Sequence, residues 1–166
     1  MPRLLPLTPI LIGLLALGAA CGDDDDRPRS PADGVAEVTR QVFAAAASER
    51  APGQEVGLSR VIVPAGEEIA PHTHPGTQLA VIVEGTLTYT VYAGEVTVTR
   101  GAGSASPRTE RIGAGATTEL NAGDALVETP GMQHSARNAG TEPVVIYLAS
   151  LFEAGAPASS PADVRR

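Results

Sequence analysis

The chain has 166 residues, the length of one domain plus a targeting or linker segment. Its 18 glycines and 14 prolines disfavour an all-helical fold, because both residues are unfavourable inside helices. The 19 acidic residues outnumber the 12 basic ones, all of them arginine, and the formal net charge is −7. Nucleic-acid binding needs a basic surface or an aromatic platform, and with three Tyr, two Phe and no Trp the chain offers neither, so we expect no nucleic-acid partner.

The N-terminus has the layout of an export signal. Arg3 precedes a nearly unbroken apolar run over residues 4–17, and the small residues 18–20 stand just before Cys21, the sole cysteine. A spanning helix needs about 20 apolar residues, so a retained transmembrane anchor is the weaker interpretation. We therefore expect a signal peptide over residues 1–20.

The segment L-G-A-A-C that ends at Cys21 resembles the lipobox of bacterial lipoprotein signals. In that motif the cysteine is acylated and becomes the first mature residue. Leu17 stands four positions before Cys21, one more than in the usual motif, so ordinary secretion is the alternative. The resemblance implies lipidation of Cys21 and a protein anchored to the extracytoplasmic face of a membrane.

Residues 21–34 contain four consecutive aspartates and several prolines but no apolar run. This composition predicts a solvated acidic tether, since calcium loops space their oxygen ligands around a glycine turn. One barrel is expected over residues 35–153, followed by a disordered tail over residues 154–166.

Short runs rich in Val, Ile, Thr and Tyr are separated by glycine and proline from residue 55 onward. They predict an all-β sandwich or barrel. The expected strands cover residues 56–63, 78–83, 86–92, 95–100, 117–120, 125–129, 135–138 and 144–151. We interpret residues 35–50 as an edge strand followed by a loop, although residues 44–50 could instead be helical. Residues 93–94 are expected to form a hairpin turn and residues 101–115 a mobile loop.

Two of the expected strands, residues 78–83 and 144–151, are apolar on both faces. In the first, Leu79 and Val81 lie on one face and Ala80 and Ile82 on the other. An apolar outer wall needs a cover, so we expect a homodimer.

The three histidines of the chain fall in two short segments. His72 and His74 are two residues apart, so on a strand both side chains leave the same face. Gln78 follows a Pro-Gly turn and can point to the same place, and strand pairing can bring His134 alongside. Three imidazoles at one point form a ligand set for Mn, Fe, Zn, Ni or Cu, whereas a single histidine is more often a surface or core residue.

These two segments resemble the motifs of the cupin family, small jelly-roll barrels that often hold a metal ion. The first motif, G-x5-H-x-H-x3-E-x6-G, is matched by Gly66, His72, His74 and Gly85, with Gln78 in the place of the glutamate. The second, G-x5-P-x-G-x2-H-x3-N, is matched by Gly123, Gly131, His134 and Asn138, with Thr129 in the place of the proline. The resemblance implies one cupin-type jelly-roll barrel and a metal site formed by His72, His74, His134 and Gln78.

Gln78 departs from the family pattern in a way that changes the expected chemistry. A neutral amide oxygen is a poorer ligand for a divalent ion than a carboxylate. The site would therefore leave the full charge on the metal, bind it less tightly, and attract an anionic ligand such as a carboxylate or an enolate.

The expected lining of the site is small and apolar: Ala80, Ile82, Leu126 or Val127, and Ala136. Tyr89 is interpreted mainly as a core residue that could also donate a hydroxyl hydrogen bond. Glu84 and Glu128 are interpreted as rim or surface charges, because no partner base or nucleophile stands near them in the sequence.

Three functions remain open from these features. The first is a metal-dependent oxygenase or lyase acting on a small organic substrate. The second is a non-catalytic module that binds a small carboxylate or carbohydrate, with or without a metal. The third is a metal-free barrel, which would account for Gln78 most simply. Fold resemblance does not choose among them.

Overall fold

The computed structural model describes residues 36–164. The expected signal peptide, the lipidation site Cys21 and the acidic tether lie outside the described residues. The described part of the chain consists of strands connected by turns, and the strands are β1 (Thr39–Ala47), β2 (Gln54–Val63), β3 (Glu68–Thr73), β4 (Gly76–Glu84), β5 (Thr86–Ala93), β6 (Glu95–Arg100), β7 (Arg108–Gly113), β8 (Thr117–Asn121), β9 (Ala125–Glu128), β10 (Gln133–Arg137), β11 (Val144–Glu153) and β12 (Ser160–Pro161). Within residues 36–164 no helix is long and apolar enough to cross a membrane.

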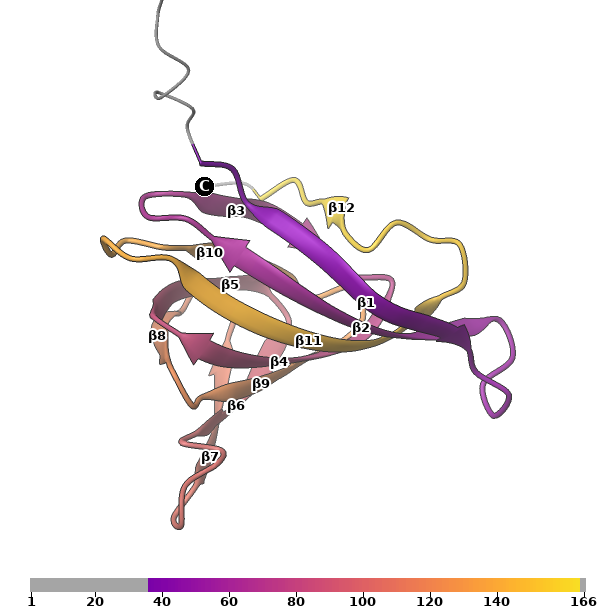
Figure 1. Ribbon diagram of the computed structural model, residues 1–166, viewed down its shortest axis with the longest axis horizontal. Helices are drawn as coiled ribbons and strands as arrows, with labels where there is room; N and C mark the ends of the chain where they lie inside the picture. Colours follow the sequence, from indigo (N-terminus) through magenta and orange to yellow (C-terminus); the bar gives the residue numbers. More distant parts are fainter. Residues whose placement is uncertain (1–35, 165–166) are drawn as a thin grey trace, which may run out of the picture. The chain divides into compact units, whose positions relative to one another are not determined.

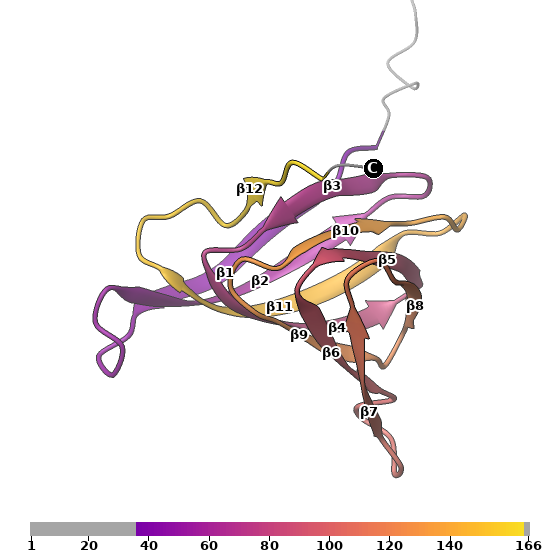
Figure 2. The same cartoon turned by 180° about the vertical axis from the view of Figure 1, so that it is seen from behind.

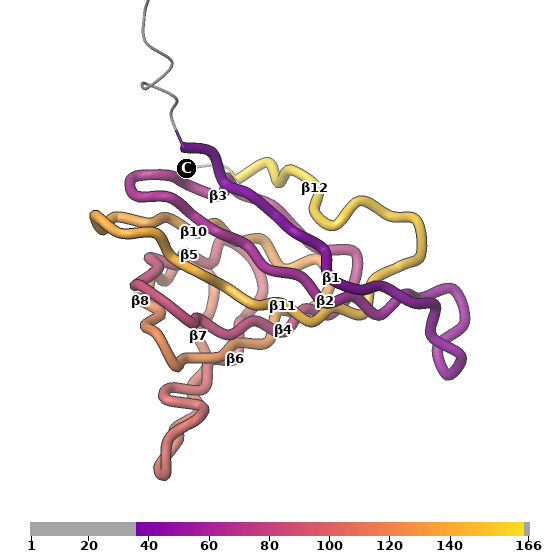
Figure 3. Tube along the Cα trace, viewed as in Figure 1, coloured from indigo at the N-terminus to yellow at the C-terminus, as the bar shows by residue number. Residues whose placement is uncertain are grey.

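The strands form two antiparallel sheets that face each other around one interior (Figures 1 and 2). The seven-stranded sheet has the order β1-β2-β11-β4-β9-β6-β7, and the five-stranded sheet has the order β12-β3-β10-β5-β8. Strands far apart in sequence are neighbours, as β2 and β11 are along the trace in Figure 3. The expected all-β fold, a single jelly-roll barrel, is confirmed.

Alternating side chains of the strands fill the barrel. Leu87, Tyr89 and Val91 of β5 share its inward face, as expected, and each is at most 2% exposed. Val, Ile and Leu from both sheets pack around them. The barrel therefore has a closed aliphatic core, and polar groups on its inner face are exceptions that need partners.

Gly85 joins β4 to β5 in a conformation that requires glycine. Its φ is +79°, and a Cβ there would lie 2.9 Å from the side chain of Val144. The last glycine of the first motif therefore serves the passage of the chain from one sheet to the other and the packing against Val144, not ligand binding.

All eight expected strands are present, but strand residues in two other segments were expected to form loops. Residues 108–113 form β7, paired with β6, where we expected part of a mobile loop. The glycine and serine of residues 101–106 mask the alternating pattern that follows them. β1 continues to Ala47 where we expected a loop, because residues 44–47 pair along β2.

Ala93 and Gly94 do not form the expected hairpin turn. β5 lies in the five-stranded sheet and β6 in the seven-stranded sheet, so these residues make a corner between the two. A Gly at positive φ suits both a hairpin and a corner, and only the pairing of the flanking strands distinguishes them.

The C-terminal segment is ordered as far as residue 164, which corrects the expected disordered tail. Ser160 and Pro161 form β12, paired with Thr73 and His72 of β3, and the amide of Ala162 donates to the carbonyl of Pro71 at 2.9 Å. Backbone pairing, not apolar burial, holds this segment, so its polar and alanine-rich composition gave no signal. It covers the strand that carries His72.

The outer face of the seven-stranded sheet is apolar, as the sequence indicates. Leu58, Ala149 and Leu79 lie in one row across β2, β11 and β4, and both leucines are exposed by more than 40%. Phe43 stacks on Tyr147 of the same sheet, with ring centroids 5.9 Å apart.

Candidate metal centre

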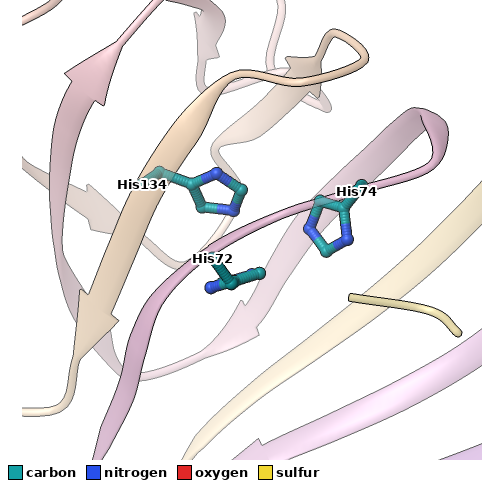
Figure 4. A group of neighbouring side chains, drawn as sticks. All are labelled: His72, His74 and His134. Carbon is teal, nitrogen blue, oxygen red and sulfur yellow. The ribbon is translucent and has the colours of Figure 1, made fainter. Parts of the chain in front are cut away.

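The three histidines meet at one point inside the barrel (Figure 4). His72 on β3 lies directly opposite His134 on β10, and His74 follows the end of β3. The ring centroids of His72 lie 4.2 Å from His134 and 4.8 Å from His74, and the candidate ligand atoms of the three residues lie within 4.8 Å of one another. The predicted convergence of His72, His74 and His134 is confirmed, and this cluster can bind a metal ion.

Backbone carbonyls set the tautomers of two of these rings. Nδ1 of His72 donates to the carbonyl of Ala70 at 2.8 Å, and Nδ1 of His74 donates to the carbonyl of Ala158 at 2.7 Å. Since a carbonyl only accepts, each neutral ring carries its proton on Nδ1 and keeps a lone pair on Nε2. Metal-binding histidines are usually oriented in this way, by a hydrogen bond from the ring nitrogen that does not bind the ion.

Glu128 lies in the centre of this site, which corrects its interpretation as a rim or surface charge. It is 3% exposed, and its Oε1 and Oε2 lie 3.2 Å from Nε2 of His134 and 3.3 Å from Nε2 of His74. Glu84, by contrast, is exposed as expected. The signal in the sequence was the alternation of β9: Leu126 points inward, so the side chain two residues later does as well.

Gln78 faces Glu128 from the neighbouring strand β4, where the two residues are direct cross-strand partners. Its Nε2 donates to Oε2 of Glu128 at 2.7 Å and lies 3.1 Å from Nε2 of His74. A carboxylate cannot donate, so the amide must turn its nitrogen towards Glu128. The amide oxygen, which was expected to be the metal ligand, is buried and accepts no hydrogen bond from residues 36–164.

Tyr89 completes the contacts of Glu128, since its hydroxyl donates to Oε1 at 2.7 Å. Burial, the charge of Glu128 and this hydrogen bond raise the pKa of Tyr89. The phenol therefore stays protonated and remains a donor, so Tyr89 is both the core residue and the hydroxyl donor that the sequence suggests.

The site keeps Glu128 ionised and His134 neutral. Burial would raise the pKa of Glu128, but the contacts with His74, His134 and Tyr89 outweigh it and lower that pKa to about 2. Burial lowers the pKa of His134 to about 4, against the opposing attraction of Glu128. At neutral pH the centre thus combines a buried carboxylate with at least one neutral imidazole, a set of donors that suits a cation.

A cavity of about 200 Å³ opens beside the histidines. The expected lining residues Ala80, Ile82, Leu126 and Ala136 all border it, and of the alternatives Leu126 and Val127 it is Leu126 that points inward. A cavity of about 150 Å³ holds a benzene-sized molecule. The site therefore admits a small organic molecule with an apolar body.

Arg40 borders the same cavity from β1 and was not singled out in the sequence. It is the cross-strand partner of Val61, whose side chain is buried in the core, so both lie on the inner face. No acidic side chain among residues 36–164 forms an ion pair with it. It brings an unneutralised positive charge to an otherwise apolar opening.

Asn138, the last residue of the second motif, has a structural role. It is 1% exposed, and its Nδ2 donates to the carbonyls of Val63 at 2.9 Å and Glu142 at 2.8 Å. Its Oδ1 accepts from the amide of Gly140 at 3.0 Å. The motif thus combines one site residue, His134, with one structural residue, Asn138, whose side chain connects the end of β2 to the turn before β11.

The comparisons with known proteins agree with this architecture. Residues 59–111 match the family model described as a cupin domain. No curated protein sequence gives a significant match. The match and the observed barrel support the cupin family.

Several solved structures are similar to this chain. A cupin superfamily protein from Desulfitobacterium hafniense is 16% identical, with 70% of this chain and 78% of that chain covered and a TM-score of 0.46. A conserved protein with a double-stranded β-helix domain from Klebsiella pneumoniae is 27% identical, with 81% and 90% covered and a TM-score of 0.44. Oxalate decarboxylase from Bacillus subtilis, which has Mn(II) centres, is 23% identical, with 64% of this chain and 23% of that chain covered and a TM-score of 0.42.

Proposed function

We propose that this chain is a cupin that holds a divalent transition metal ion, Mn, Fe, Zn, Ni or Cu, through His72, His74 and His134. The observation that carries the proposal is the convergence of the three rings, two of which have Nδ1 bound to a carbonyl and a lone pair on Nε2. The donor set also fits a cation because Glu128 adds a buried negative charge beside these nitrogens.

We propose further that the protein is a metal-dependent oxygenase or lyase that acts on a small organic substrate. A bound divalent ion would polarise a substrate oxygen as a Lewis acid. The chain's own contribution is the cavity: Ile82, Leu126 and Ala136 hold the apolar body of the substrate and exclude water, and Arg40 binds an anionic group at the opening.

The alternative is a non-catalytic module that binds a small carboxylate, and Arg40 favours it. Arg40 borders the cavity without an acidic partner among residues 36–164 and is available to an anion, whereas Glu128 already accepts hydrogen bonds from Tyr89 and Gln78. Isothermal titration with benzoate and with benzyl alcohol tests this function. It predicts binding of benzoate only, lost in Arg40→Gln and kept in the control Arg137→Gln, which changes an exposed arginine.

Metal content is the first experiment for the proposed function. The full chain is reconstituted with each candidate metal, dialysed and measured by elemental analysis, beside the double variant His72→Ala, His74→Ala and the control Glu84→Gln. We expect one bound ion per chain in the wild type and the control, and only traces in the double variant. If the wild type contains only trace metal, the proposed metal site is contradicted and the metal-free barrel is the remaining hypothesis.

Activity is then tested on the metal-loaded protein. Oxygen consumption and ultraviolet absorbance are followed across a panel of enolic and phenolic substrates. Turnover that is lost in the double variant would support the enzymatic function. If the metal-loaded protein converts no substrate of the panel, the result supports the non-catalytic binding module.

We also propose that the protein is exported and anchored through a lipid on Cys21, as the lipobox resemblance implies. In cell fractionation, the wild type is expected in the membrane fraction and Cys21→Ser in the soluble extracytoplasmic fraction. Equal membrane retention of both would contradict the anchor.

A further inference from the structure

Gln78 and Glu128 occupy adjacent positions on β4 and β9, and both side chains point into the metal centre. The cupin motif places its glutamate at position 78, where this chain has an amide. The carboxylate is present nonetheless, one strand away, and the two side chains are joined by a 2.7 Å hydrogen bond. A carboxylate is therefore present beside the histidines, although it comes from position 128 and not from position 78.

We propose that Glu128 supplies the carboxylate ligand of the metal centre and that Gln78 is a positioning residue that orients it. The inference rests on the proposed metal site and names a residue of that site. It replaces the expectation that the amide oxygen of Gln78 binds the metal.

The first argument is electrostatic. Oε2 of Glu128 lies 3.3 Å from Nε2 of His74, and that nitrogen carries a lone pair when Nδ1 donates its proton to Ala158. The amide nitrogen of Gln78, 3.1 Å from this nitrogen, can donate to that lone pair when no ion is bound, but the two acceptors still repel each other, and a cation between them would remove that repulsion. Oε1 lies 3.2 Å from Nε2 of His134, but Nδ1 of this ring has no hydrogen-bond partner among residues 36–164, so without an ion the ring can carry its proton on Nε2 and donate it to Glu128.

The second argument is the spacing of these atoms. Ligand atoms about 2.1 Å from a shared ion, at tetrahedral or octahedral angles, lie about 3.0–3.4 Å from each other. The nitrogen–oxygen separations of 3.2 and 3.3 Å fall in this range. The carboxylate is therefore placed as a neighbour of His74 and His134 in one coordination sphere.

The third argument concerns what holds the carboxylate. Gln78 donates to Oε2 and Tyr89 to Oε1, both at 2.7 Å, so two donors fix the orientation of Glu128 while each oxygen keeps a further lone pair. Ligating carboxylates are commonly held in this way. The unpartnered amide oxygen of Gln78 points away from this contact, which the nitrogen already occupies.

One consequence is the charge of the site. Three neutral imidazoles and one carboxylate reduce the charge of a divalent ion by one, whereas three imidazoles and an amide would leave it unchanged. The weaker affinity and stronger Lewis acidity expected from Gln78 are thus replaced by the behaviour of a site with a carboxylate.

Zinc and manganese affinities of four variants of the full chain test the assignment, measured by competition with a chelator. Glu128→Gln removes the carboxylate and is expected to weaken binding by more than about tenfold. Gln78→Ala keeps the ligand but loses its orientation and is expected to weaken binding less. The double variant Gln78→Glu, Glu128→Gln exchanges the two groups and is expected to recover most of the affinity. Glu84→Gln, an exposed change on β4, is the control.

Wild-type affinity in Glu128→Gln would overturn the assignment of the ligand, and no binding by the wild type would overturn the proposed metal site itself. Infrared difference spectra of the wild type keep the test independent of variant stability. Zinc is expected to shift a carboxylate stretching band, and zinc binding without such a shift would overturn the assignment of Glu128.

Discussion

The backbone carbonyl of Ala158 accepts a 2.7 Å hydrogen bond from Nδ1 of His74, so the C-terminal segment contacts the proposed metal centre on the side of the ring away from the other histidines' ligand atoms. This hydrogen bond connects two residues that are 84 positions apart in the chain. Through this contact a segment without apolar packing takes part in fixing a ligand ring.

Deleting residues 157–166 is therefore expected to weaken metal binding by about tenfold, because His74 loses the acceptor that fixes its tautomer and orientation. Isothermal titration of the full chain and the truncated chain measures the change. A chain that ends at Asp163 keeps Ala158 and β12 and is expected to bind as the wild type does. Equal affinities of all three chains would show that the tail does not position the ligand.

Asn138→Ala is expected to lower the free energy of unfolding by about 3 kcal/mol, since the buried carbonyls of Val63 and Glu142 and the amide of Gly140 lose their partner. Urea denaturation measures this loss. Metal affinity below the transition should stay unchanged, because Asn138 contacts none of the three histidines. A stable variant with weakened metal binding would assign this motif residue to the site instead.

The stability of the barrel is expected to depend on pH through the carboxylate of Asp124. Burial would raise the pKa of Asp124, but the amides of Asn121 and Gly101 and the Arg100 guanidinium outweigh it and lower that pKa. Because the folded value lies below the unfolded value of about 3.9, this carboxylate stabilises the fold above about pH 4, and the contribution is lost as the pH falls towards the folded value.

The variant Asp124→Asn tests this dependence through the free energy of unfolding measured between pH 7 and pH 3. We expect it to be less stable by about 1–3 kcal/mol at pH 7, with the difference shrinking at the acid end. A constant difference across the range would mean that the charge of Asp124 does not contribute.

The apolar row Leu58, Ala149 and Leu79 needs a cover, and we propose that a second copy of the chain provides it. Light scattering after size exclusion at micromolar concentration is expected to give a dimer for the wild type and a monomer for Leu79→Arg. Thr117→Arg, an exposed change on the other sheet, should remain dimeric. A monomeric wild type would contradict the proposed dimer.

The barrel fold and the histidine cluster could be predicted from the sequence because both depend on local patterns. Strand alternation placed Leu87, Tyr89 and Val91 correctly, and the spacing of His72 and His74 placed both rings together. Glu128 was missed although Leu126 two residues before it points inward, because an acidic residue is usually exposed and its partners Gln78 and Tyr89 are distant in sequence. The tail was missed because only its backbone makes the contacts.

The most direct test of the metal centre is anomalous diffraction from crystals of the zinc-loaded full chain. We expect one zinc ion within about 2.0–2.2 Å of Nε2 of His72, His74 and His134 and of at least one carboxylate oxygen of Glu128, with the nitrogen of Gln78 still bound to Glu128. The absence of an anomalous peak between the three histidines would contradict the proposed centre.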